Sequence, residues 1–171
     1  MSSLQFITQA VGSSVTSLSV TNCFSADYEN YLIQQTDYTA HGANAQSIIR
    51  LINSSGTVIS ATDYNIASQF MPSYSSFVED RYTSRSFLFD GLSVDQNDTI
   101  GGGATFHLFS PFDSSKYTFG LHQQASFNTG SGVWGRKNIA VLKQTVSITG
   151  LQILSTGSTT ISTNIKIFGV K

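Results

Sequence analysis

The chain has 171 residues and a net charge of −1, and only 11% of its residues are charged while 40% are hydrophobic and 12% aromatic. This length is typical of one domain with a substantial core, so we expect residues 1–171 to form a single domain. Nucleic-acid-binding proteins concentrate Lys and Arg, and disordered tracts lack aromatic anchors, so the composition argues against both classes. The apolar runs are too short to cross a bilayer, and residues 1–20 lack a basic leader region. We therefore expect no membrane partner, no nucleic-acid partner and no secretory signal.

Residues near both ends of the chain alternate between apolar and polar side chains. In the first run Leu4 and Phe6 share one side, and Ile7 is the one apolar residue on the other side. Near the C-terminus, Ile165 lies on an apolar side and Lys166 on the opposite polar side. Such a period of two predicts strands that place one face on a core and the other toward water.

Seven further runs are rich in residues that suit a pleated sheet. They are Tyr28–Thr36, Ser47–Ile52, Thr57–Ala61, Ser86–Asp90, Ala104–Ser110, Tyr117–Ala125 and Ile139–Lys143. Turns are predicted at Asn53–Gly56 and Ser155–Ser158, and Gly-, Asn- and Asp-rich loops at Asp95–Gly103, Ser110–Ser115 and Asn128–Gly135. Only Phe70–Arg85 has weak helical spacing, which predicts a single helical turn.

These runs give about nine to eleven strands, and no helical segment is long enough to connect parallel strands. The strands therefore pair antiparallel, with turns at the spacing of a β-sandwich. The predicted fold class is all-β, an antiparallel and jelly-roll-like β-sandwich.

Residues that could carry chemistry are few and scattered. The three histidines, His41, His107 and His122, have no close ligand spacing, so we expect no metal site and no cofactor. His107 and His122 could lie on neighbouring strands. The one cysteine, Cys23, excludes an intramolecular disulfide and is most simply a small buried hydrophobic residue. We expect a non-enzymatic protein, because no nucleophile, base and acid converge in the sequence.

Aromatic residues are the best candidates for contact with a ligand or a subunit. Trp134 lies in the Gly-rich run 130–135, which predicts an exposed loop, and Tyr74 and Tyr82 come from the Tyr-rich middle of the chain. Aromatic rings stack on the apolar faces of sugars, and they are also enriched in subunit interfaces. Both interpretations of these three residues stay open.

A resemblance to a known family rests on seven segments spread over the whole chain. The segments are Ser2–Ile7, Phe24–Tyr31, Ser47–Ile52, Ser110–Thr118, Gly135–Asn138, Thr149–Ile153 and Lys166–Lys171. In this order they resemble small β-sandwich virion proteins of tailed cyanophages and marine bacteriophages. The matching residues include turn and core positions such as Pro111 and Phe112, and the resemblance brings no catalytic residue with it.

The resemblance implies a structural protein on the outer surface of a virion, made in the cytoplasm of the host bacterium. A head decoration or appendage component is the first expectation, and a tail-associated or glycan-binding module that recognises a host receptor is the alternative. The resemblance also implies a homo-oligomer, often a trimer, that contacts other phage virion proteins, and a host-surface glycan is a further candidate partner. The weakly charged, hydroxyl-rich composition is permissive of such close packing, since net charge near zero favours association.

Overall fold

The computed structural model describes residues 3–41, 45–94, 101–130, 132–157 and 159–171, and every regular element in these ranges is a β-strand. The twelve strands are β1 (Leu4–Val15), β2 (Ser17–Val20), β3 (Asn30–His41), β4 (Ala45–Asn53), β5 (Tyr64–Pro72), β6 (Val78–Arg85), β7 (Phe89–Val94), β8 (Gly102–Phe109), β9 (Thr118–Asn128), β10 (Gly132–Leu142), β11 (Ile148–Ser155) and β12 (Thr160–Val170). The described ranges contain no helix long and apolar enough to cross a membrane.

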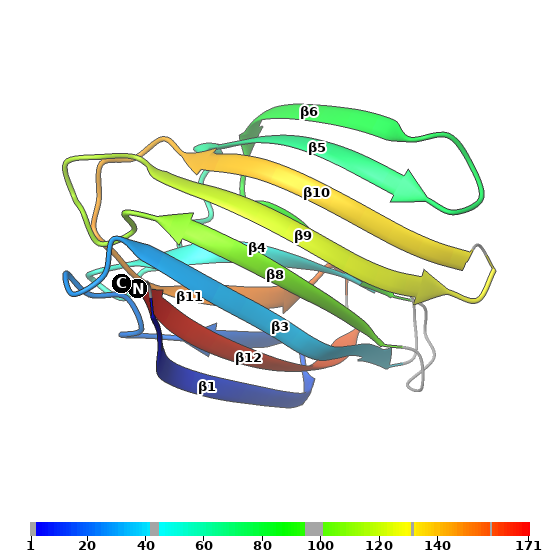
Figure 1. Cartoon of the computed structure of the whole chain (residues 1–171), viewed down its shortest axis with the longest axis horizontal. Coiled ribbons are helices and arrows are strands. Elements are labelled where there is room, and N and C mark those ends of the chain that lie inside the picture. The colour runs from blue at the N-terminus through cyan, green and yellow to red at the C-terminus, as the bar shows by residue number, and fades with distance from the viewer. Residues whose placement is uncertain (1–2, 42–44, 95–100, 131, 158) are drawn as a thin grey trace.

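Two antiparallel sheets of unequal size stack as a sandwich (Figure 1). The larger sheet has eight strands in the order β1-β12-β3-β8-β9-β10-β5-β6, and the smaller has four in the order β2-β11-β4-β7. Their facing sides share one hydrophobic core, which includes Tyr31, Ile49 and Phe106. The predicted all-β antiparallel sandwich is confirmed, with twelve strands in place of nine to eleven.

Strand β12 shows how closely the sequence period follows the fold. Ile165 is fully buried in the core and Lys166 is half-exposed on the other side of the same strand. Because side chains of a strand alternate between two faces, the predicted inward and outward sides of this run are confirmed.

Strand β1 has the opposite orientation to the predicted one at its start. Leu4 and Phe6 are 57% and 51% exposed, whereas Ile7 packs against the core. The register of β1 against β12 shifts between Phe6 and Thr8, so an irregularity in the strand separates the two outward residues from the segment that follows. The prediction that Leu4 and Phe6 face the core is therefore wrong.

The predicted helical turn at 70–85 is also wrong. This segment contains the end of β5, a turn and the whole of β6, which pair from Tyr64↔Arg85 to Phe70↔Val78. Tertiary pairing along the edge of the larger sheet overrides the weak helical spacing. The strand predicted at 57–61 is reduced to one isolated bridge, Ile52↔Val58. Beside this bridge the Ile59 amide donates to the Leu51 carbonyl at 2.9 Å, and the Ile59 carbonyl accepts from the Tyr64 hydroxyl at 3.0 Å.

Two of the predicted loops are shorter than expected. The run 128–135 is mostly strand, because β9 continues to Asn128 and β10 begins at Gly132. Of the loop predicted at 95–103, residues 95–100 lie outside the described residues, and β8 begins at Gly102. Glycine does not stop these strands, because the long antiparallel ladders on both sides hold the backbone extended.

Candidate interaction surface

The outer face of the eight-stranded sheet is the side turned away from the smaller sheet, and it carries an unusual number of apolar side chains. Along β9, Phe119, Leu121 and Phe127 are 52%, 42% and 42% exposed on this outer face. The residues between them, such as His122 and Gln124, point into the protein and are buried. Strand β9 therefore places its apolar side outward and a partly polar side inward, which is the reverse of a sheet that has one face in water.

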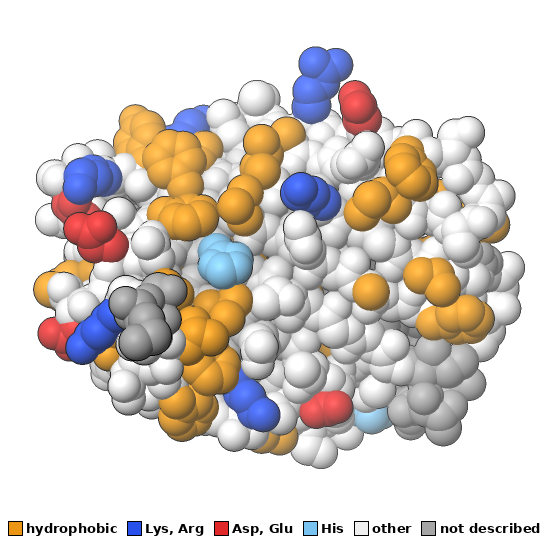
Figure 2. Space-filling view, viewed as in Figure 1, with side chains coloured by type: hydrophobic (Ala, Val, Ile, Leu, Met, Phe, Trp, Pro, Cys, Tyr) orange, Lys and Arg blue, Asp and Glu red, His pale blue; other side chains and the backbone are white. Residues whose placement is uncertain are grey.

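Strand pairing aligns these outward residues into rows that cross the sheet. We define the apolar rows as two adjacent sets of directly paired outer residues. The first contains Leu4, Val170, Asn30, Phe109, Phe119, Val141 and Asn65, and the second contains Phe6, Phe168, Leu32, His107, Leu121, Ile139, Ala67 and Arg81. Figure 2 shows hydrophobic side chains gathered on the left half of this face, above and below a histidine.

A third row beside the apolar rows is polar. We define the glutamine row by its paired members Gln9, Lys166, Gln34, Thr105, Gln123, Lys137, Gln69 and Glu79. The outer face is therefore banded, with the apolar rows toward one end of the strands, the glutamine row next to them, and a further exposed apolar pair, Phe127 and Val133, at the other end. An interface usually has an apolar centre and a polar margin, and the glutamine row supplies such a margin on one side of the apolar rows.

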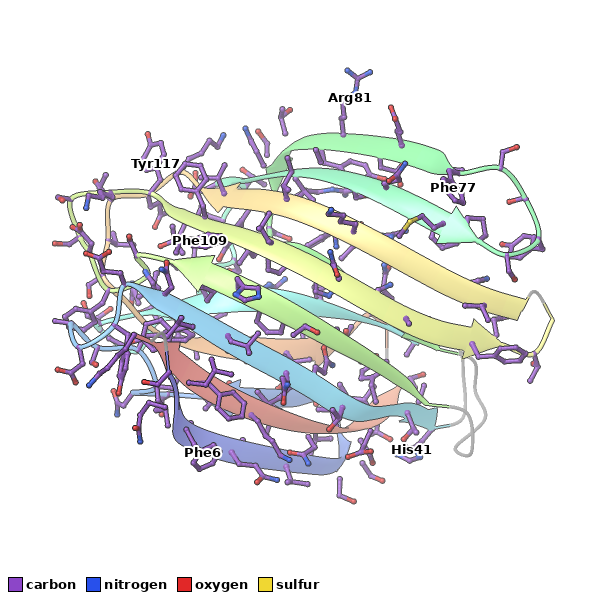
Figure 3. All side chains as sticks on the ribbon, in the orientation of Figure 1. Phe6, His41, Phe77, Arg81, Phe109 and Tyr117 are labelled. Carbon is purple, nitrogen blue, oxygen red and sulfur yellow. The ribbon has the colours of Figure 1, made fainter. Side chains whose placement is uncertain are left out.

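The apolar rows have an exposed aromatic pair, which we call the ridge, near one edge of the sheet and a hollow near the other. On β1 and β12, the rings of Phe6 and Phe168 meet edge to face with centroids 5.7 Å apart. Between β10, β5 and β6, a groove of about 350 Å³ is lined by residues that include Ala67, Arg81 and Ile139. Figure 3 shows that Phe6 and Arg81 lie at opposite edges of the sheet.

The exposed apolar area of this face matches the largest apolar patch of a typical monomer. A large side chain has roughly 150–250 Å² of surface to bury, and five members of the apolar rows are 42–57% exposed: Leu4, Phe6, Phe119, Leu121 and Ile139. These five alone leave roughly 400–500 Å² of apolar surface, within the range of about 300–600 Å² of the largest patch on a typical monomer. The largest apolar patch of a monomer is often functional.

A polar cluster lies inside the sandwich, beneath β9 and β10. The Arg136 guanidinium donates to an Asp90 carboxylate oxygen at 2.9 Å, and both side chains are nearly buried. The Asn138 side-chain amide donates to the Asp90 carbonyl at 3.0 Å and lies 2.8 Å from His122 Nδ1. The cluster thereby joins β7 of the smaller sheet to β9 and β10 of the larger one.

Burial controls the charges in this cluster. Desolvation, with a smaller contribution from Arg136, lowers the pKa of His122 to about 3, so the imidazole is neutral at pH 7. Desolvation also raises the pKa of Asp90 above its usual value, while the charge of Arg136 acts in the opposite direction. His122 is fully buried and stacks on Phe89 with centroids 5.1 Å apart. This geometry holds two sheets together and offers His122 no contact with solvent.

The histidines and the cysteine do not converge. His107 and His122 lie on the neighbouring strands β8 and β9, but His107 faces outward in the second apolar row and His122 faces inward. His41 contacts Ser162 Oγ at 2.8 Å on the outer side of β3 and β12. Cys23 is buried as predicted, and burial raises the pKa of its thiol to about 12. No group of three His, Cys, Asp or Glu residues within the described part of the chain could hold a metal ion.

The aromatic candidates from the sequence occupy different surroundings. Trp134 belongs to β10 and not to an exposed loop; it is half-buried, with its ring edge-to-face on Phe70 at 5.6 Å between centroids. Tyr74 lies in the turn after β5 and is 54% exposed. Tyr82 is half-buried on β6, beneath the Arg85 guanidinium at 3.8 Å from the ring centroid.

These three residues do not form one site. Trp134 pairs with Pro72 and Tyr82 pairs with Ile66, so six residues of β5, or roughly 20 Å, separate the two positions along the sheet. The turn that holds Tyr74 begins beside Trp134, because the Ser73 amide donates to the Val133 carbonyl at 2.9 Å. Sequence reasoning missed the outer face, because its members come from eight strands whose order the local pattern does not reveal.

Comparison with known proteins gives no family. No protein-family model matches the chain, and no curated protein matches it. Among solved structures, that of the infectious bursal disease virus Gt strain is 13% identical, with a TM-score of 0.14, and the match covers 99% of this chain and 38% of that one. The VP2 subviral particle of the same virus gives 14% identity, a TM-score of 0.16 and the same two coverages. The chain thus spans about 38% of the two viral chains it matches, and TM-scores this low carry no argument about fold or function.

Proposed function

We propose that the protein is a non-enzymatic structural protein of a tailed-phage virion, exposed on the particle surface as a head decoration or appendage component. The observation that carries the proposal is the outer face of the larger sheet, where two apolar rows lie beside the glutamine row with no layer of this chain's described residues over them. A face of this kind fits a protein that functions by packing against other proteins. The sequence resemblance to small phage virion proteins favours a phage virion as the assembly in which this face is packed.

Localisation on intact particles tests this function. Purified virions are labelled with gold-conjugated antibody against the protein and viewed by electron microscopy, and their protein content is measured by mass spectrometry. We expect label over the head or at an appendage in many copies per particle. Label confined to the tail tip would favour the tail-associated alternative, and absence from purified particles would overturn the proposal.

A glycan-binding role is the second candidate, and one exposed turn favours it. Tyr74 and Phe77 are 54% and 63% exposed in the turn between β5 and β6 (Figure 3 labels Phe77). Tyr74→Ala tests this role on a glycan array more cleanly than Trp134→Ala, because Trp134 is half-buried against Phe70 and its removal would also loosen the sheet. A bound sugar that Tyr74→Ala releases, with the oligomer unchanged, would assign receptor recognition to this turn.

A further inference from the structure

We propose that the outer face of the larger sheet binds the same face of a second copy of this chain, as a two-fold, face-to-face pair of sheets. The inference rests on the proposed function only in treating this face as an assembly surface. Three features favour a second copy as the occupant of this face: the order of the strands, the ridge and hollow defined above, and the area of the face.

The area fits a second copy. Eight strands about 4.8 Å apart and three rows about 7 Å apart along the strands give a face of roughly 700 Å². A stable interface of standard size buries about 800 Å² on each partner, so this face alone nearly supplies it. Two twisted sheets also pack readily face to face, about 10 Å apart, when their strands are nearly aligned.

The two-fold axis that gives the largest overlap while keeping row on row lies parallel to the strands and passes between β8 and β9, the middle pair of the sheet. Rotation about this axis places β1 of one copy over β6 of the other and β12 over β5. The ridge of Phe6 and Phe168 then meets the hollow beside Ala67 and Arg81. In the middle of the face, Leu32 meets Ile139 of the other copy.

The other in-plane axis does not keep row on row. An axis that runs across the strands places every strand over its own copy and reverses the order of the rows, so an axis through the second apolar row would set Arg81 against Arg81 and the first apolar row against the glutamine row. Around the axis parallel to the strands, Arg81 faces Phe6 and Lys137 faces Gln34, and a guanidinium over an aromatic ring is attractive. Like-charge contact costs free energy in an interface, so the parallel axis is favoured.

The first experiment measures the mass of the purified protein by sedimentation velocity over a range of concentrations. We expect a species of twice the 18.5 kDa of one chain. Ile139→Asp places a charge in the second apolar row, opposite Leu32 of the other copy, and should give a monomer. Phe77→Asp is the matched control, because Phe77 is equally apolar and 63% exposed but lies in a turn outside the rows; it should leave the dimer intact.

A charge exchange then tests the orientation of the two copies. Phe6→Lys opposes Arg81 of the other copy and should weaken association at least tenfold, and adding Arg81→Glu should restore it. Phe6 and Arg81 lie on opposite edge strands of one chain, so the introduced amine and carboxylate can meet only between copies. Both side chains are exposed, and circular dichroism should show unchanged folding.

Three results would overturn the inference: a wild-type monomer at every concentration, a wild-type trimer, or a double variant no tighter than Phe6→Lys alone. These measurements use purified protein, so they separate this inference from the proposed function. A protein that dimerises as described but is absent from virions would retain the interface and lose the virion role.

Discussion

Leu121 and His122 are consecutive residues of β9, yet Leu121 is 42% exposed on the outer face and His122 is fully buried between the sheets. A strand that turns leucine and phenylalanine outward and histidine and glutamine inward has two partly buried faces, one within the chain and one toward a neighbour. Of the inward polar groups, His122 is held by the cluster around Asp90 and Asn138. The outward apolar groups have no equivalent partner among the described residues, and this asymmetry is the basis for the proposed assembly.

Ile165→Asp should lower the free energy of unfolding more than any substitution of an exposed residue on the same strand. Ile165 is fully buried in the core, and an unpaired charge there costs about 3–5 kcal/mol of unfolding free energy. Lys166→Asp is the matched control, because Lys166 is half-exposed in the glutamine row. Urea denaturation of both variants at a concentration below that of association checks this prediction, and equal midpoints would contradict the assigned faces of β12.

Gly120→Ala should lower stability by about 1–3 kcal/mol, which is the usual cost of overpacking a core. An added Cβ at Gly120 would collide with the Phe89 ring and press on Leu108. Gly103→Ala is the control on the neighbouring strand β8, where the nearest atom to the new methyl group is 3.5 Å away. Thermal unfolding of the two variants separates lost space from a general effect of replacing glycine in a strand.

Asp90→Ala should destabilise the protein by about 3–5 kcal/mol, because it leaves the Arg136 guanidinium nearly buried without its carboxylate. Adding Arg136→Met should recover part of this loss, since it removes the unpaired charge and keeps an apolar side chain against Phe70. Chemical denaturation of the two single variants and the double variant gives the coupling energy. Strictly additive losses would mean that the ion pair does not connect the sheets.

The sequence predicts the fold class because the fold depends on a local property, the period of two. The faces of β12 follow from it directly, as Ile165 and Lys166 show. The period does not say which of two faces is inward, and in β9 and at the start of β1 the apolar side is outward. The period alone therefore predicts Leu4 and Phe6 in the core, whereas the structure places them on the outer face.

The candidate surface could not be predicted, because it is a property of strand order. Phe6 lies on β1 and Arg81 on β6. The six strands that lie between β1 and β6 in the larger sheet connect these two residues into one row. Residue type alone indicates the aromatic candidates, and the structure places one of them, Trp134, in a strand against Phe70. One sequence feature does point to the surface: Phe119, Leu121 and Phe127 alternate with Thr118, His122 and Gln124 along β9, so one side of this strand is polar although both sides are partly buried.

Acid should destabilise the protein through His122. Its pKa is about 3 in the folded protein and about 6.5 in an unfolded chain, so between these values the unfolded state binds the additional proton. The stabilising effect of the neutral, buried ring is fully present above pH 6.5 and is lost as the pH falls toward 3. With about 1.4 kcal/mol for each pH unit, the loss over this window is a few kcal/mol.

His122→Phe keeps a ring against Phe89 but cannot be protonated, so its free energy of unfolding should fall less steeply than that of the wild type between pH 6.5 and 4. Parallel curves for the two proteins in urea denaturation would assign the acid sensitivity to other groups.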